Sequence, residues 1–163
     1  TVEDCKVLAR LPAVRFYKDA IHVFQDVNIE ETIPILSYIS NFKLKQVEEL
    51  IRLYGKMGWK YFRSAGILLA NGNISILVPP IIEEQDGKLY VVSGHARIYA
   101  LRALGEKKVS AVVVRGVNKQ FSTTPTKWSK VSVVDDIKGR EKPHLSRYVE
   151  TNMHIGVWAK EAE

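Results

Sequence analysis

The chain has 163 residues, of which 46% are hydrophobic and 26% charged, as in an ordinary globular domain. Its net charge of +6 favours anionic partners such as nucleotides or nucleic acid, although a basic surface also serves solubility alone. The single cysteine, Cys5, excludes an internal disulfide, and no apolar run reaches the roughly 20 residues that span a bilayer. These properties predict a cytoplasmic protein without a membrane partner.

In the first half of the chain, the spacing of apolar residues predicts three helices and one strand. The clearest helix is KLKQVEELIRLYGKMG, whose apolar residues recur three and four positions apart and therefore share one face. Glycines favour its termination at the end of this stretch. The expected elements are a short helix ended by Pro12, a strand with an irregular middle over 20–31, the amphipathic helix over 43–58 and a further helix over 59–73.

The second half of the chain predicts mainly strands. Asp86-Gly87 between two apolar runs is a strong signal for a two-residue hairpin turn. The acids beside this turn, Glu83, Glu84 and Asp86, are expected on a solvated edge, where charge discourages pairing with another chain, rather than in a magnesium site. The expected elements are strands over 74–94, 107–117 and 131–137, a loop over 118–130 and a helix over 142–163.

One further helix interrupts these strands, in HARIYALRALG. Ile98, Leu101 and Leu104 share one face of it, and Gly105 favours its end. Strands and helices are therefore interleaved along the chain, which indicates an α+β fold.

The parts of a phosphate site lie at a strand-to-helix junction, in VVSGHAR. The first N–H groups of a helix lack partners, and its dipole places positive charge there. Gly94 permits a sharp turn, Ser93 caps the helix or donates to an oxygen, and Arg97 supplies a forked donor. His95 exchanges a proton near neutral pH, and Arg102 reaches the same anion or points into solvent. The same residues also suit an ordinary solvated helix start, so local chemistry leaves both interpretations open.

Residues 79–114 resemble the core of the ParB/sulfiredoxin-like superfamily, which includes ParB-like nuclease domains. The matching parts are a Pro-Ile-Ile strand at Pro80–Ile82, the Asp86-Gly87 hairpin, the strand Leu89–Val92, a Gly-x-x-Arg box at Gly94–Arg97, Ala100 and Gly105 in the following helix, and the strand Val109–Val114. The resemblance implies a mixed sheet packed with helices over residues 1–117, with an insertion at 58–76. It leaves 118–163 as a C-terminal extension packed on this core.

The box differs from each branch of the superfamily. Sulfiredoxin-like members have a cysteine where this chain has His95, so their thiol chemistry is not expected. Partition proteins have Gly-Glu-Arg-Arg, and the acid and the first arginine are absent here. The closest form is the Asp-Gly-His-His-Arg of the free-serine kinase branch, with Ser93 for the aspartate and Ala96 for the second histidine. That branch also uses a glutamate base near the first strand, a region where this chain has Glu30 and Glu31.

The resemblance implies a nucleotide-binding domain, because members of the superfamily hold nucleotide phosphates on this box. We expect ATP or another nucleoside triphosphate, with Mg²⁺, followed by hydrolysis or phosphoryl transfer. His95 is the candidate catalytic group, as the polar side chain nearest the reacting phosphate. The expected phosphate-binding residues are Ser93, Gly94, His95, Ala96, Arg97 and Arg102.

The alternative is a DNA-binding regulatory or partition module without catalysis. Its phosphate contacts would include Lys107, Lys108 and Lys119, in the most basic part of the chain. A nuclease and a partner-docking domain with a degenerate box also stay open. The sequence assigns no metal ligands, and it leaves the base preference, the phosphoryl acceptor and the oligomeric state undecided.

Overall fold

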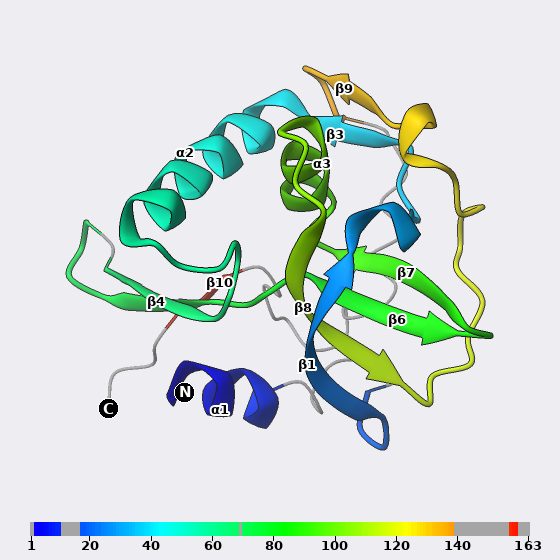
Figure 1. Ribbon diagram of the computed structural model, residues 1–163, viewed down its shortest axis with the longest axis horizontal. Helices are drawn as coiled ribbons and strands as arrows, with labels where there is room; N and C mark the ends of the chain where they lie inside the picture. Colours follow the sequence, from blue (N-terminus) through cyan, green and yellow to red (C-terminus); the bar gives the residue numbers. More distant parts are fainter. Residues whose placement is uncertain (1, 11–16, 69, 139–156, 160–163) are drawn as a thin grey trace.

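The computed structural model of the protein describes residues 2–10, 17–68, 70–138 and 157–159. Its main element is a five-stranded mixed sheet (Figure 1). The strands lie in the order β1 (Ile21–Asn28), β8 (Lys108–Arg115), β6 (Ile81–Gln85), β7 (Lys88–Ser93) and β2 (Thr32–Pro34). β8 runs parallel to β6 and β2 runs parallel to β7, whereas the other two pairs are antiparallel. The predicted α+β class with a mixed sheet is confirmed.

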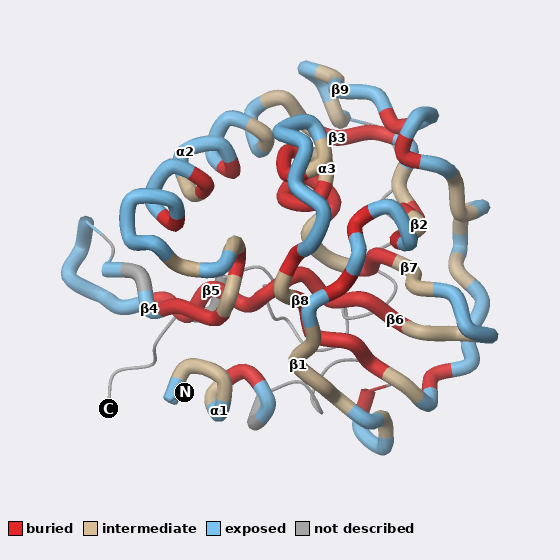
Figure 2. The backbone as a smooth tube through the Cα atoms, viewed as in Figure 1, coloured by how far each residue is buried: buried red, intermediate tan, exposed pale blue. Residues whose placement is uncertain are grey.

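Both faces of this sheet are covered, because successive residues of its central strands point to opposite sides. Val112 and Val114 of β8 belong to the apolar cluster on one face, and Val113 belongs to the cluster on the other. Ile81 and Ile82 of β6 divide in the same way. Figure 2 shows β6, β8 and α3 (His95–Ala103) largely buried, while the outer side of α2 (Asn41–Met57) is exposed. A strand buried on both faces has a continuous apolar sequence, which is why the strand at 107–117 was predictable.

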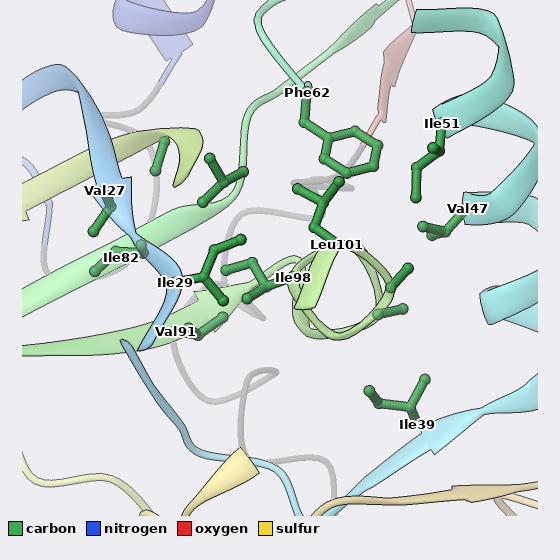
Figure 3. Packing of buried hydrophobic residues seen from close by; sticks show 14 of the residues in the cluster. Val27, Ile29, Ile39, Val47, Ile51, Phe62, Ile82, Val91, Ile98 and Leu101 are labelled. Carbon is green, nitrogen blue, oxygen red and sulfur yellow. The ribbon is translucent and has the colours of Figure 1, made fainter. Parts of the chain in front are cut away.

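The helices α2 and α3 cover one of these faces, and α3 lies between α2 and the sheet (Figure 1). Figure 3 shows Ile98 of α3 directed toward Ile29 and Leu101 directed toward Phe62. The predicted helix over 43–58 is confirmed as α2, although it begins at Asn41 because the side chain of Ser40 caps it.

The segment over 59–73 is not the predicted helix. Its first part is a loop, and Ala65–Leu68 form β4, which pairs antiparallel with β5 (Ile74–Leu77). Phe62 has a φ of 61°, a left-handed conformation that does not occur inside a right-handed helix. The apolar spacing of so short a stretch suits a helix or a strand equally, and pairing with β5 decides between them.

Two further strands complete the smaller sheets. β10 (Val157–Ala159) pairs with β5, so the predicted terminal helix is wrong for these residues, and the rest of that prediction lies outside the described residues. The strand predicted over 131–137 is confirmed in shorter form as β9 (Ser132–Val134), which runs parallel to β3 (Tyr38–Ser40).

The N-terminal elements follow the sequence pattern with one correction. The short helix before Pro12 is confirmed as α1 (Val2–Arg10). The first strand has no irregular middle, because every residue of β1 pairs with β8, and a 3-10 helix, η2 (Ile29–Glu31), follows it. The predicted loop after β8 contains a second 3-10 helix, η3 (Trp128–Lys130). Each helix within the described ranges is too short or too polar to cross a bilayer.

The predicted buried face of α3 is confirmed for Ile98 and Leu101 but wrong for Leu104, which is 61% exposed. The helix ends at Ala103, and Leu104 already serves as its C-cap, where the chain turns away from the core.

Leu101→Ala should therefore lower the free energy of unfolding by about 2–5 kcal/mol, because it opens a cavity between α2 and the sheet. Leu104→Ala is the matched control and should change it by less than about 0.5 kcal/mol. Urea denaturation of both variants measures the difference, and equal losses would contradict the packing described for α3.

Candidate functional site

The junction between β7 and α3 turns at Gly94, as the sequence predicts. Its φ of +98° is a left-handed conformation, and an added Cβ would lie 2.9 Å from the Cβ of Pro80 and 3.1 Å from Nη2 of Arg97. Glycine is therefore required here by backbone conformation and by space. Gly94 is itself the N-cap of α3, and no side chain caps the helix, so the capping role predicted for Ser93 is wrong.

The first turn of α3 leaves backbone donors without acceptors. Ile98 is the first residue whose N–H bonds within the turn, to the carbonyl oxygen of Gly94 at 3.0 Å. In the part of the chain that the structure describes, the N–H groups of Ala96 and Arg97 have no hydrogen-bond acceptor. No acidic residue lies in this first turn to offset the helix dipole. Such a helix start attracts an anion.

Arg97 brings a buried positive charge to this turn. The residue is 6% exposed, its Nη1 donates to the carbonyl oxygen of Val78 at 2.5 Å, and its guanidinium carbon lies 5.7 Å from the ring centre of Phe62. Burial lowers the pKa of Arg97 to about 10, while the nearby Tyr54 raises it. No carboxylate among the described residues pairs with Arg97. Among the described residues, the guanidinium is thus buried without a counter-ion.

A second cation, Lys43, lies near Arg97 and was missed in the sequence. Its side chain keeps access to solvent, but surrounding protein atoms lower its pKa by desolvation, and the charge of Arg97 lowers it further. Lys43 is in the first turn of α2, just after the Ser40 cap, and that turn also contains no acid. A lysine at this end of a helix opposes the dipole, which is the one sequence signal that pointed to it.

His95 is buried at the same turn, but its lone pair is already used. Ile35 donates its backbone N–H to Nε2 of His95 at 3.1 Å, and the imidazole lies 6.3 Å from the ring of Trp128. In this contact Nε2 accepts a hydrogen bond and does not donate one. The catalytic role of His95 stays a prediction, and this geometry supports a positioning role, since it joins α3 to the chain after β2.

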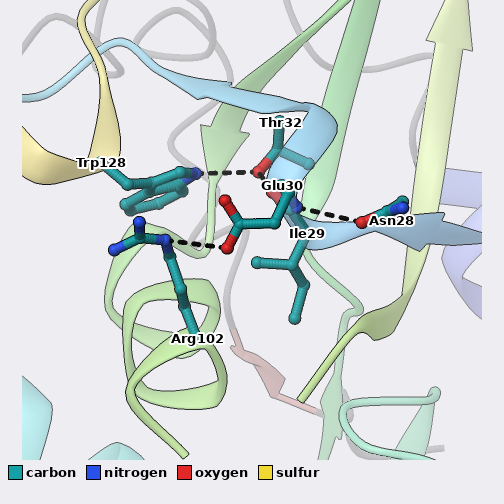
Figure 4. A network of polar contacts seen from close by, with 6 residues as sticks. All are labelled: Asn28, Ile29, Glu30, Thr32, Arg102 and Trp128. Carbon is teal, nitrogen blue, oxygen red and sulfur yellow. Dashed lines mark hydrogen bonds and ion pairs between the residues drawn. The ribbon is translucent and has the colours of Figure 1, made fainter. Parts of the chain in front are cut away.

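Arg102 does not lie beside the first turn of α3. Its Nε forms an ion pair with Oε1 of Glu30 at 3.2 Å, near the other end of the helix (Figure 4). Asn28 orients Glu30 by accepting its backbone N–H, and Nε1 of Trp128 donates to Oγ1 of Thr32 nearby. Arg102 therefore fixes η2 to α3, and Glu30, in the region where a base was considered, is bound to it.

The three lysines of the DNA-binding alternative do not form one patch. Lys107 and Lys108 lie at the start of β8, where Lys108 pairs with Asn28, while Lys119 follows its other end. There the carbonyl oxygen of Lys119 accepts from Gln85, at the end of β6. A strand of this length separates the two positions by about 25 Å.

The acids near the hairpin do not all lie on a solvated edge. Glu83 is fully buried on the central strand β6, where the hydroxyl of Tyr17 donates to it at 2.8 Å and Nε2 of Gln85 at 3.0 Å. Glu84 is paired with Arg115 across the sheet. The expectation is therefore wrong for Glu83. Within the described ranges, no group of three or more His, Cys, Asp or Glu residues gathers in metal-binding positions.

Replacing His95 by leucine should lower the free energy of unfolding by about 1–3 kcal/mol, because the buried N–H of Ile35 loses its acceptor.

His22→Leu is the control, since the buried Nε2 of His22 has no partner among the described residues and burial lowers the pKa of this histidine. The neutral form of His22 is favoured in the folded state. Its contribution to the free energy of unfolding is therefore complete above the ordinary pKa of histidine and is lost as the pH falls below that value. Urea denaturation at pH 7 and pH 5 should show a loss for His95→Leu and a smaller acid-induced loss for His22→Leu than for the wild type. Equal behaviour of the two variants would contradict these assignments.

Residues 3–132 match the protein family described as the ParB CE domain. This match covers all five strands of the main sheet, the helices α2 and α3, and the Gly94–Arg97 box. No curated protein matches the chain. The ParB resemblance is confirmed, while the similarity of the box to the free-serine kinase branch stays a prediction. The geometry of the sheet, the box and the matched residues together show that the chain belongs to the ParB CE domain family.

Proposed function

We propose that this ParB-like domain binds the phosphates of a nucleoside triphosphate, ATP or another, at the first turn of α3. The observation that supports this most strongly is the guanidinium of Arg97, which is buried with no carboxylate partner in the described chain. Burying an unpaired charge is unfavourable, and an anion bound beside it would remove the penalty. The unbonded N–H groups of Ala96 and Arg97 are the matching backbone donors.

The first turn of α3, with the charges of Arg97 and the nearby Lys43, favours a multiply charged anion over a single carboxylate. α2 and α3 both begin without an acidic residue, and each carries a cation in its first turn, Lys43 and Arg97. A phosphate group accepts several hydrogen bonds at once and suits the forked guanidinium. Mg²⁺ would enter with the triphosphate, since phosphate oxygens and water are its usual ligands in such sites.

Phosphoryl transfer or hydrolysis is the activity that fits such a site, because this chemistry needs positioning and charge neutralisation more than a covalent partner. Arg97 and Lys43 would neutralise charge on the transferred group, and the backbone N–H groups would orient it. His95 would hold the turn in place through Ile35, so that the donors keep their direction.

Calorimetry with ATP, CTP, GTP and UTP, each with and without Mg²⁺, tests this function. The wild type should bind at least one triphosphate. Lys43→Met should weaken that binding about tenfold, as expected for the loss of one charged hydrogen bond. Lys45→Met, on an exposed position of the same helix, should leave it within about twofold.

Arg97→Met should abolish binding, because it removes the guanidinium that would contact the phosphates. The melting temperature of the ligand-free protein should change little, because relief of a buried charge without a carboxylate partner in the described chain offsets the lost hydrogen bond to Val78. Circular dichroism confirms that the variant is folded. Failure of every triphosphate to bind the wild type would contradict the proposal, and so would equal effects of Lys43→Met and Lys45→Met.

A further inference from the structure

We propose that the segment Phe62–Ser64 forms a second wall of this site, in which Arg63 and Ser64 donate to the outer phosphates of the ligand. The proposal rests on the proposed function and assigns new residues to it. The segment lies outside the Gly-x-x-Arg box, in the stretch that the sequence suggested to be an insertion. Contacts from Arg63 and Ser64 to the outer phosphates would select nucleoside di- and triphosphates over monophosphates.

The segment lies directly beside Arg97. The ring of Phe62 is the surface against which the guanidinium packs, at 5.7 Å. Ala65 pairs with Leu77, so Ser64 directly precedes, and Val78 directly follows, the paired ends of β4 and β5. The carbonyl oxygen of Val78 is the acceptor that holds Arg97. Phe62 thus contacts the guanidinium, and Ser64 lies next in the chain to the strand pair that leads into its acceptor, Val78.

Two successive side chains of the segment have polar atoms that are buried without partners. Ser64 is 3% exposed and its Oγ has no hydrogen-bond partner, and Nε of Arg63 is also buried and unbonded. Buried polar groups in folded proteins are almost always hydrogen-bonded, so each exception calls for an explanation. Both groups are donors beside a proposed anion site, and phosphate oxygens would supply the acceptors that they lack.

Tyr54 fixes the segment through its hydroxyl and its ring. Its hydroxyl donates to the carbonyl oxygen of Arg63 at 2.5 Å, and its ring lies 5.5 Å from that of Phe62. Burial raises the pKa of Tyr54 to about 12, while Arg97 and then Arg63 lower it, so both charges are near this hydroxyl. The guanidinium of Arg63 also lies over the ring of Trp59, at 4.0 Å, which holds it in place.

Lys43 is near Arg97, and Arg63 and Arg97 both act on Tyr54, so three cations are linked through Arg97, and this number sets the class of ligand. Lys43, Arg63 and Arg97 come from α2, the loop before β4 and α3, and none pairs with a carboxylate of the described residues. A single phosphate group carries at most about two negative charges. Three cations therefore fit a chain of two or more phosphates better than a monophosphate.

Calorimetry with the mono-, di- and triphosphate of the tightest-binding nucleoside tests this assignment. The wild type should bind the triphosphate at least about tenfold more tightly than the monophosphate, as for one added charged hydrogen bond. Ser64→Ala should weaken triphosphate binding about fivefold and Arg63→Gln about tenfold, with little change for the monophosphate. Arg52→Gln is the control for lost charge, because Arg52 is exposed on α2 and paired with Glu49.

Ser64→Ala also has a stability signature that a purely structural serine would not show. Removing an unpaired buried hydroxyl should raise the melting temperature of the ligand-free protein by about 2 °C. Thr32→Val is the matched control and should lower it, because that hydroxyl bonds to Ile29 and Trp128.

The outcomes separate this inference from the proposed function. If the wild type binds triphosphate and Ser64→Ala and Arg63→Gln keep its preference over monophosphate, the second wall is disproved and the site on α3 stands. If the wild type binds no phosphate compound, both proposals fail together.

Discussion

The hydrogen bond from Arg97 to the carbonyl oxygen of Val78 brings together the parts of the molecule on which the site depends. The guanidinium comes from α3, its acceptor lies between β5 and β6, and Phe62 precedes β4. Position 94 requires glycine partly because the guanidinium of Arg97 occupies the space where a side chain would begin. A charged group is held inside the protein by elements from distant parts of the sequence, and the apolar packing around α3 has to offset its desolvation.

This arrangement relates stability to binding. Within the described ranges, the buried charge of Arg97 has no carboxylate partner and buried donors are unbonded. Such groups lower the free energy of unfolding, and a bound anion would raise it. Such local violations of the rules of packing concentrate at functional sites. The left-handed Phe62 belongs to the same group of features, because it is a bulky residue in a conformation that glycine ordinarily adopts. The free energy of unfolding would thus increase when an anion binds.

Sequence patterns could predict the sheet and the box but not the rest of the site. Asp86-Gly87 and the valine-rich strand β8 have local signals that tertiary contacts do not override. Ser64 has no such signal, and Lys43 has only that of a lysine in the first turn of a helix. Their place near Arg97 depends on the packing of α2 on α3 and on the pairing of β4 with β5. The hydrogen bond that His95 accepts from Ile35 was equally out of reach of sequence patterns, since Ile35 is sixty residues earlier in the chain.

The most direct measurement of the central claim is a crystal structure of the protein with a non-hydrolysable nucleoside triphosphate. The account predicts phosphate oxygens within hydrogen-bond distance of the Arg97 guanidinium and of the N–H of Ala96, with the carbonyl of Val78 still bound to Arg97. A triphosphate bound elsewhere on the molecule, or a carboxylate of the protein paired with Arg97 in the crystal, would contradict it.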